Sequence, residues 1–262
     1  LDIVGTGGDG TGTFNISTTA AFIIAAAGIP VAKHGNRSMS SKSGSADCLE
    51  QLGININITP EKSEEVLNKA GICFMFAQGY HSSMKYVGPV RKEIGIRNIF
   101  NVLGPLTNPA GADLQVTGVY SEDLVEPIAQ VFSNLGVKKG YVFYGMDGMD
   151  EVTLTTTTKV CEIDNGRFNT FVLNPEDYGL KLCSPEDLAG GDGKENAEIT
   201  KEILSGEIKD AKRDIVVLNA ALGLCTGGKA DSIQDGIKLA NEIIDSGKAY
   251  AKIEEFAKAS NE

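Results

Sequence analysis

Near its start the chain has a short apolar segment, then a glycine-rich loop with glycines at 5, 7, 8, 10 and 12, then the hydroxyl-rich beginning of an apolar helix. Glycine lets backbone N–H groups approach a ligand closely because it has no Cβ. A helix N-terminus adds unpaired N–H donors and a partial positive charge. This combination predicts a binding site for a phosphate or a diphosphate.

Two familiar nucleotide-binding motifs fit this stretch poorly. The dinucleotide fingerprint opens directly onto a helix and needs an acidic residue after the second strand. Here Phe14-Asn15-Ile16 intervenes, and the second expected strand is followed by Lys33-His34. A P-loop requires Lys and then Ser or Thr after its last glycine, and this loop has neither in that place. Taken alone, the stretch could also be an ordinary glycine-rich turn.

A basic turn, Lys33-His34-Gly35-Asn36-Arg37, follows the second expected strand and precedes a hydroxyl-rich segment, 38–45. Ligands of an open α/β sheet bind at the carboxyl ends of its strands. Because an acidic chain that binds an acidic substrate needs local cations, Lys33, Arg37 and Arg91 are candidates. The alternative for Lys33 and Arg37 is ordinary solvated surface charge.

An acidic loop, 145–151, contains Asp147, Asp150 and Glu151. Carboxylates this close repel one another unless a cation lies between them. Magnesium uses one or two protein carboxylates together with substrate phosphates. With the glycine loop, Asp150-Glu151 therefore indicates a magnesium–diphosphate substrate, whereas a polar β-turn is the alternative for this loop alone.

Together these segments resemble the anthranilate phosphoribosyltransferase family. The resemblance runs from residue 2 to about residue 250 and rests on motifs in the family's order: Gly5–Asp9, Asn15–Thr18, Lys33–Arg37, Ser43–Asp47, Arg91–Arg97, Asn101–Pro109, Asp150-Glu151 and Ala230–Ser232. The family normally has a helical segment before the glycine loop, whereas this sequence begins at Leu1, so we expect that segment to be missing here.

The resemblance implies a glycosyltransferase of tryptophan biosynthesis. It would transfer the phosphoribosyl group of phosphoribosyl diphosphate (PRPP) to the amine of anthranilate, giving phosphoribosyl-anthranilate and diphosphate, with no side-chain nucleophile. By resemblance, PRPP is bound by Gly5, Gly8, Asp9, Thr13, Asn15, Ser17, Thr18, Lys33, Asn36 and Ser45. Anthranilate is bound by Gly5, His34, Asn36, His81, Arg91 and Pro105. Two Mg²⁺ ions are implied, one held by Ser17 and Glu151 and one by Asp150 and Glu151.

Three other functions stay open. A pyrimidine nucleoside phosphorylase-like enzyme has a related fold, but its substrate has no diphosphate for Asp150-Glu151 to serve. A non-catalytic nucleic-acid-binding relative would need a basic surface, whereas the net charge is −11 and the sequence pI is about 4.8. A third possibility is a fragment that binds the diphosphate without turnover.

Composition bears on the compartment and the partners. The five cysteines are scattered, odd in number and without metal-ligand spacing, which is typical of reduced thiols in the cytoplasm. No apolar run in this sequence approaches the ~20 residues of a membrane helix, and we expect no export leader. We therefore expect no membrane and no nucleic-acid partner, and the resemblance implies a homodimer of the full-length protein.

The elements that must position these residues alternate between strand and helix, which predicts an α/β fold with a mostly parallel central sheet flanked by helices. By resemblance the fold is of the nucleoside phosphorylase/phosphoribosyltransferase type. Residues 1–78 and 99–262 would form the catalytic domain, and 79–98 a helical insertion of a small helical domain. Expected strands after the first cover 29–32, 54–58, 72–77, 117–120, 141–144 and 153–157. Expected helices cover 20–27, 45–52, 60–70, 80–94, 124–135, 196–204, 215–224 and 232–244, and 187–195 is expected to be the loosest segment.

Overall fold

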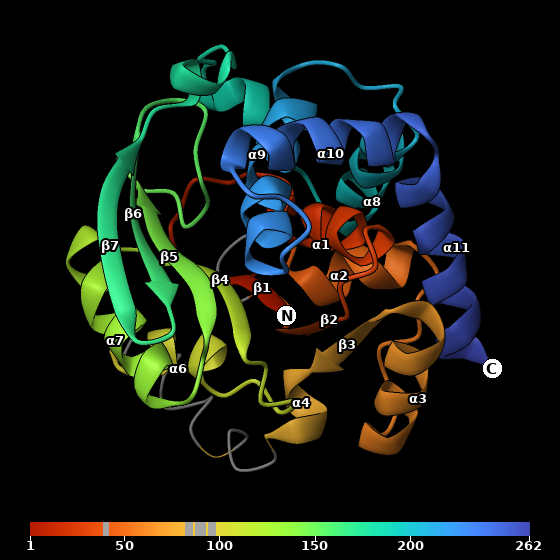
Figure 1. Ribbon diagram of the computed structural model, residues 1–262. Coiled ribbons are helices and arrows are strands. Elements are labelled where there is room, and N and C mark those ends of the chain that lie inside the picture. The colour runs from red at the N-terminus through yellow and green to blue at the C-terminus, as the bar shows by residue number, and fades with distance from the viewer. Residues whose placement is uncertain (39–41, 82–85, 87–92, 94–97) are drawn as a thin grey trace.

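The centre of the fold is a mixed five-stranded sheet in the order β1-β4-β5-β6-β7 (Figure 1). The computed structural model describes residues 1–38, 42–81, 86, 93 and 98–262. The first three strands of the sheet are parallel and the last two form an antiparallel hairpin. These strands are β1 (Asp2–Gly5), β4 (Leu114–Gly118), β5 (Lys139–Gly145), β6 (Thr158–Asp164) and β7 (Arg167–Leu173).

A parallel two-stranded sheet, β2 (Val31–Gly35) and β3 (Ile72–Phe76), lies beside β1. The two sheets meet where Ala32 N donates to Leu1 O at 2.9 Å. The carboxyl ends of β1, β2, β4 and β5 are thereby brought to one region. Ligands of open α/β sheets bind at such ends, so this arrangement determines where the site lies.

Helices cover both faces of the five-stranded sheet (Figure 1). Alternate residues of β5 and β6 point to opposite faces. On one face Val142 and Ile163 pack with Phe132 of α7, and on the other Phe143 and Val160 belong to the core shared with α1 and α9. The helices of the described residues are α1 (Ile16–Ala26), α2 (Ser45–Gln51), α3 (Pro60–Ala70), α4 (Ala77–Tyr80), α6 (Phe100–Leu106), α7 (Val125–Asn134), α8 (Gly193–Leu204), α9 (Ala211–Thr226), α10 (Ile233–Asp245) and α11 (Lys248–Asn261), with 3₁₀ turns η1 (Glu122–Leu124), η2 (Pro175–Tyr178) and η3 (Pro185–Leu188). Within the described part of the chain, none of the helices is long and apolar enough to cross a membrane.

Local signals explain where several helices begin and end. At α3 the Thr59 side chain accepts from Lys62 N, Pro60 fills the first turn, and Gly71 ends the helix with a left-handed φ of 71°. At α8 the Asp192 side chain accepts from the N–H groups of Lys194 and Glu195. In the same turn the backbone N–H of Asp192 donates to the side chain of Glu195. The expected helix at 60–70 is confirmed at both ends.

The α/β fold with its central sheet is confirmed, but two expected strands are wrong. Residues 54–58 alternate between buried Ile54 and Ile56 and exposed asparagines, yet they form no strand. The backbone N–H of Asn55 donates instead to Ser260 Oγ of α11, at 3.0 Å. Alternation thus indicated correctly which residues are buried, but it could not show that a neighbouring strand was lacking.

The second wrong strand, 153–157, is irregular, and the sheet continues only from β6 onward. β6 returns as β7 through Asn165-Gly166, whose φ angles of 51° and 81° suit a tight hairpin turn. This hairpin makes the sheet more mixed than expected. The expected helix at 80–94 and the division at 79–98 lie largely outside the described residues. Helix α11 was not expected at all.

Candidate active site

The glycine loop joins β1 to α1, and its conformation requires its glycines. Gly7, Gly8, Gly10 and Gly12 have φ between 71° and 79°, a region that side chains with a Cβ rarely adopt. Asn15 is the residue that precedes the first turn of α1. The loop therefore presents backbone groups together with the N-terminus of a buried helix, as a phosphate-binding loop does.

The acidic loop lies directly on the glycine loop. Gly7 N donates to Asp150 Oδ2 at 2.6 Å, and Ser17 N donates to Glu151 Oε1 at 3.1 Å. The approach is so close that a Cβ on Gly118 would lie 1.7 Å from Asp150 O. A Cβ on Gly5 would likewise lie 2.3 Å from Asp150 Oδ2. Two segments about 140 residues apart in the sequence therefore meet at the strand ends.

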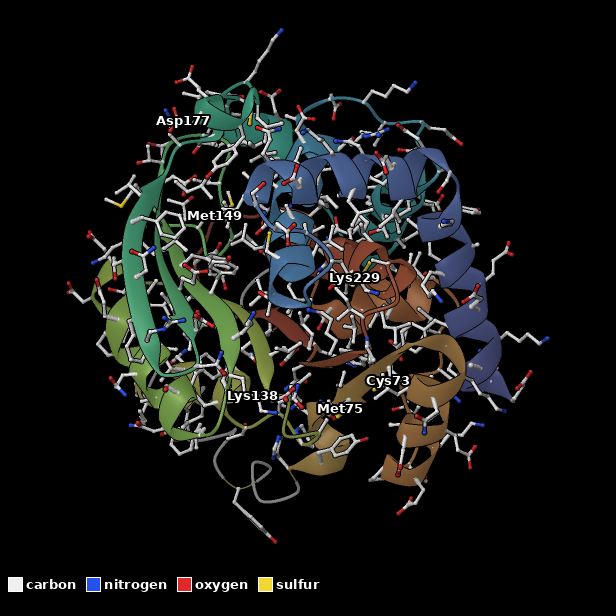
Figure 2. The ribbon with its side chains drawn as sticks, viewed as in Figure 1. Cys73, Met75, Lys138, Met149, Asp177 and Lys229 are labelled. Carbon is white, nitrogen blue, oxygen red and sulfur yellow. The ribbon has the colours of Figure 1, made fainter. Side chains whose placement is uncertain are left out.

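The loop that carries these carboxylates is well packed behind them. Met149 precedes Asp150 and is buried in the main core (Figure 2). Asp147 Oδ2 accepts from Thr153 Oγ1 at 2.6 Å, and Asp147 Oδ1 accepts from Met149 N at 3.1 Å. Asp147 therefore stabilises the turn, and the pair that faces the glycine loop is Asp150 and Glu151.

The two carboxylates are buried, with 8% and 7% of their surface exposed. Burial raises the pKa of Asp150 well above its usual value, and the charges of Asp9 and Glu151 raise it further. Burial also raises the pKa of Glu151 to about 7, against the lowering effects of Lys33 and of Ser17. Such a pair is stabilised by a cation.

Magnesium fits this donor set. Within the described ranges, no group of three or more His, Cys, Asp or Glu side chains is arranged to hold a metal ion by itself. Magnesium commonly takes one or two protein carboxylates and completes its coordination with substrate phosphates. Asp150 and Glu151, beside a phosphate-binding loop, match that requirement.

Lys33 is a buried cation, 3% exposed, whose charge interacts with those of Glu151 and Asp150. Its Nζ donates to Ile3 O and, at 3.4 Å, to Ser17 Oγ. Burial lowers the pKa of Lys33, while the charges of Asp2, Glu151 and Asp150 raise it. Asp2 was not among the expected site residues. It is fully buried, and its Oδ1 accepts from His34 N at 3.2 Å.

Two histidines meet beside the basic turn. His34 Nδ1 lies 3.0 Å from Gly104 O. Because a carbonyl only accepts, Nδ1 carries the hydrogen, and in the neutral ring Nε2 is then an acceptor. His81 Nε2 lies 3.2 Å from that atom and must donate to it. Burial lowers the pKa of His34, which keeps this ring neutral. Pro105 follows Gly104, so three of the expected anthranilate residues lie together.

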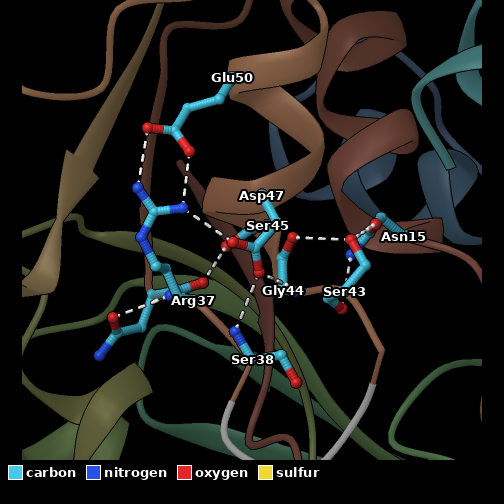
Figure 3. Close-up of polar contacts among 9 residues, drawn as sticks. Asn15, Arg37, Ser38, Ser43, Gly44, Ser45, Asp47 and Glu50 are labelled. Atoms are coloured by element: carbon cyan, nitrogen blue, oxygen red, sulfur yellow. Dashed lines mark hydrogen bonds and ion pairs between the residues drawn. The ribbon is translucent and has the colours of Figure 1, made fainter. Parts of the chain in front are cut away.

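Arg37 does not point at the glycine loop. Its guanidinium donates twice to Glu50, at 2.6 and 2.8 Å, and once to Asp47, at 2.8 Å (Figure 3). Asp47 Oδ2 in turn accepts from Ser38 N at 3.2 Å and Gly44 N at 2.9 Å. Arg37 and Asp47 therefore hold the two described ends of the hydroxyl-rich segment, and the charge of Arg37 is already paired.

The remaining expected residues are distributed as follows. Thr13 bridges to Ala189, and Gly190 N donates to Gly12 O at 3.0 Å, so segment 187–195 is attached to the glycine loop. Asn15 shares a hydrogen bond with Ser43, and Ser45 Oγ donates to Asn36 O at 3.3 Å. Thr18 is almost completely buried. Arg91 lies outside the described residues.

Known proteins resemble this chain along its whole length. A family described as "Glycosyl transferase family, a/b domain" matches residues 1–250. A protein of Methanobrevibacter smithii named anthranilate phosphoribosyltransferase is 58% identical over all of this chain and 78% of its own length. One of the same name from Ruminiclostridium cellulolyticum is 57% identical, over all of this chain and 76% of its own length.

Solved structures agree with these relatives. Anthranilate phosphoribosyltransferase from Thermus thermophilus superposes with a TM-score of 0.94 at 45% identity, over all of this chain and 78% of that one. The enzyme from Saccharomyces cerevisiae, solved in complex with PRPP and Mg, gives 0.92 at 32% identity, over all of this chain and 73% of that one. The whole of the fold described above is thus shared with these structures.

Proposed function

The chain belongs to the anthranilate phosphoribosyltransferase family, and we propose that it performs the family's reaction in the site described above. The reaction transfers the phosphoribosyl group of PRPP to the amine of anthranilate and releases diphosphate, a step of tryptophan biosynthesis. The observation that carries the proposal is the contact of Asp150 with the glycine loop, through Gly7 N, and of Glu151 with the first turn of α1, through Ser17 N. A phosphate-binding loop with two buried carboxylates beside it suits a diphosphate that carries magnesium.

PRPP would lie against the glycine loop and the start of α1. Gly5, Gly8, Asp9, Thr13, Asn15, Ser17, Thr18, Lys33, Asn36 and Ser45 are the residues proposed to bind it. Ser17, Asp150 and Glu151 would hold Mg²⁺, and we propose two ions. When bound, Mg²⁺ supplies positive charge that stabilises the leaving diphosphate. Lys33 Nζ, bonded to Ser17 Oγ, adds a buried positive charge beside the same residues.

Anthranilate would lie on the side of the paired histidines, against Gly5, His34, Asn36, His81 and Pro105, with Arg91 proposed for its carboxylate. A guanidinium binds a planar carboxylate through two parallel hydrogen bonds. An aromatic amine is unprotonated near neutral pH and is therefore already nucleophilic, so the reaction needs no strong base, and His34 is proposed to position anthranilate. As diphosphate leaves, positive charge develops at ribose C1, and the amine attacks the opposite face with inversion. Positioning and charge stabilisation supply most of the catalysis, without a side-chain nucleophile.

The proposal extends to assembly and compartment. All five cysteines are free thiols, which suits the reducing cytoplasm. We propose that the protein works there as a homodimer, and that residues 79–98 belong to a small helical domain facing the α/β domain.

The reaction can be tested directly by the loss of anthranilate fluorescence. We expect the signal to fall when PRPP and Mg²⁺ are both present, and not when either is omitted. The parallel incubation contains a pyrimidine nucleoside and inorganic phosphate, without PRPP. Release of the free base in that incubation, with no use of anthranilate in the first, would instead identify a nucleoside phosphorylase.

A further inference from the structure

Two asparagines behind the site are almost completely inaccessible: Asn196 of α8 is 1% exposed and Asn219 of α9 is 0% exposed. A buried amide destabilises the fold unless its donors and acceptor are paired. Both amides are paired, and both reach from a helix of the core to one of the loops that form the site. Neither was among the residues expected from the sequence.

Asn219 holds the acidic loop. Its Nδ2 donates to Val152 O at 2.8 Å and to Ile215 O at 2.9 Å, and Val152 N donates to its Oδ1 at 3.0 Å. Val152 directly follows Glu151. Two opposed hydrogen bonds to one residue fix the orientation of both of its peptide groups. The direction in which the chain leaves Asp150-Glu151 is therefore set by α9.

Asn196 holds the start of α1. Gly191 N donates to Asn196 Oδ1 at 2.8 Å, and because a backbone N–H can only donate, the other amide atom is the nitrogen. That nitrogen donates to Asn15 Oδ1 at 2.9 Å. Ser43 Oγ donates to the same oxygen at 3.1 Å. The amide of Asn15 is therefore fixed with its oxygen toward α8 and Ser43.

This orientation determines what Asn15 offers to a ligand. Its Nδ2 carries two hydrogens, and one of them faces Ser43 O at 3.5 Å. None of the described residues is bonded to the other hydrogen, which can be donated to an acceptor such as a phosphate oxygen or a ribose hydroxyl. If the amide turned over, Asn15 would present an acceptor to the phosphates, and an acceptor repels them.

We propose that Asn219 and Asn196 are positioning residues that hold the two halves of the site independently. Asn219 sets the carboxylates that would bind Mg²⁺, and Asn196 sets the Asn15 donor that would bind PRPP. This inference rests on the proposed function for the identity of the two ligands. It predicts that replacing one asparagine weakens the binding of one ligand and leaves the binding of the other unchanged.

Each variant is chosen to remove one set of bonds. Asn219→Ala removes both bonds to Val152, and Asn219→Ser is a milder second variant in case the first does not fold. Asn196→Asp keeps an acceptor for Gly191 N but removes the donor to Asn15 Oδ1. The control is Asn241→Ala. Asn241 is hydrogen-bonded to Arg213 of α9 and Ile237 of α10, and neither residue belongs to a loop of the site.

Two binding measurements separate the ligands without relying on turnover. Mn²⁺, as a probe for Mg²⁺, is titrated by electron paramagnetic resonance at saturating PRPP, and PRPP is titrated by calorimetry at saturating Mg²⁺. We expect both Asn219 variants to raise the dissociation constant for Mn²⁺ roughly tenfold and to leave that for PRPP within about twofold of the wild-type value. We expect Asn196→Asp to raise the dissociation constant for PRPP roughly tenfold and to leave that for Mn²⁺ within about twofold of the wild-type value. Asn241→Ala should change only the melting temperature.

Equal losses of both ligands in the Asn219 and Asn196 variants, or losses no larger than in the control, would overturn the inference. If the variants show the expected split but the wild-type chain does not use anthranilate, the proposed function is contradicted and the inference stays intact. A wild-type chain that binds neither ligand would overturn both.

Discussion

Replacing Glu151 by glutamine should make the metal-free protein more stable at alkaline pH while weakening magnesium binding. The Glu151 carboxylate is buried, and its pKa in the folded protein is raised from 4.5 to about 7. A carboxyl whose pKa is raised by folding stabilises the fold fully only below its unfolded value. That contribution is lost as the pH rises through about 7. Glutamine removes the titration and keeps an Oε1 atom for the N–H of Ser17.

The magnitude follows from the size of the shift. Between pH 4.5 and pH 8 the contribution of the Glu151 carboxyl to the unfolding free energy of the wild type falls by about 3 kcal/mol, because each pKa unit is worth 1.36 kcal/mol. The variant loses the attraction between Glu151 and Lys33, so about 3 kcal/mol is an upper limit for its gain at pH 8. In melting temperature, the difference between variant and wild type should grow by up to roughly 6 °C from pH 5 to pH 8.

The assay is thermal unfolding of both proteins in EDTA at several pH values from 5 to 8.5, repeated with Mg²⁺ and PRPP. We expect the variant to have the flatter pH dependence in EDTA and the smaller rise in melting temperature when the ligands are added. Asp150 is present in both proteins, but the charge of Glu151 helps to raise its pKa, so the substitution also brings the pKa of Asp150 closer to its usual value and flattens the pH dependence of the variant further. Parallel curves in EDTA would refute the electrostatic reasoning, and equal ligand effects would refute the role of Glu151 in binding the metal.

Three further substitutions test other contacts. Gly118→Ala places a Cβ where it would meet Asp150 O, and it should lower turnover ~100-fold with an unchanged circular dichroism spectrum. The matched control is Gly79→Ala, where a Cβ meets none of the described residues within 4 Å. Lys33→Met should raise the Michaelis constant for PRPP. Because Lys33 lowers the pKa of Glu151, the variant should also move the acid limb of the pH–rate profile to higher pH. An unmoved acid limb would contradict this reasoning. His81→Phe leaves His34 Nε2 without this donor and should raise the Michaelis constant for anthranilate ~5-fold but not that for PRPP; equal changes for both would exclude a specific role.

Signals confined to a few neighbouring residues predicted the structure best. The glycine loop, the helix start at Thr59-Pro60 and the end at Gly71 follow from the conformational preferences of single residues, and all three are found. The meeting of the glycine loop with Asp150-Glu151 could also be predicted, because carboxyl ends of parallel strands meet at one edge.

What the sequence could not show are pairings over long distances. Alternation at 54–58 predicts buried isoleucines but not whether a strand lies beside them. Arg37 is in the motif of a phosphate site, but its partners Asp47 and Glu50 lie on α2 and neutralise it. Asn196 and Asn219 carry no local signal, since their partners are other parts of the chain. The β6–β7 hairpin did have a local sequence signal, because the pair Asn165-Gly166 is typical of a tight hairpin turn.

The central claim is that Asp150 and Glu151, beside the glycine loop, serve a magnesium–diphosphate substrate. The most direct test measures diphosphate release and anthranilate consumption together, over a range of Mg²⁺ concentrations, in the wild type and in the double variant Asp150→Asn, Glu151→Gln. We predict equal molar amounts of both in the wild type, dependence on Mg²⁺, and at least a ~100-fold lower rate in the double variant. Near-normal turnover by the double variant at low Mg²⁺ would contradict the claim.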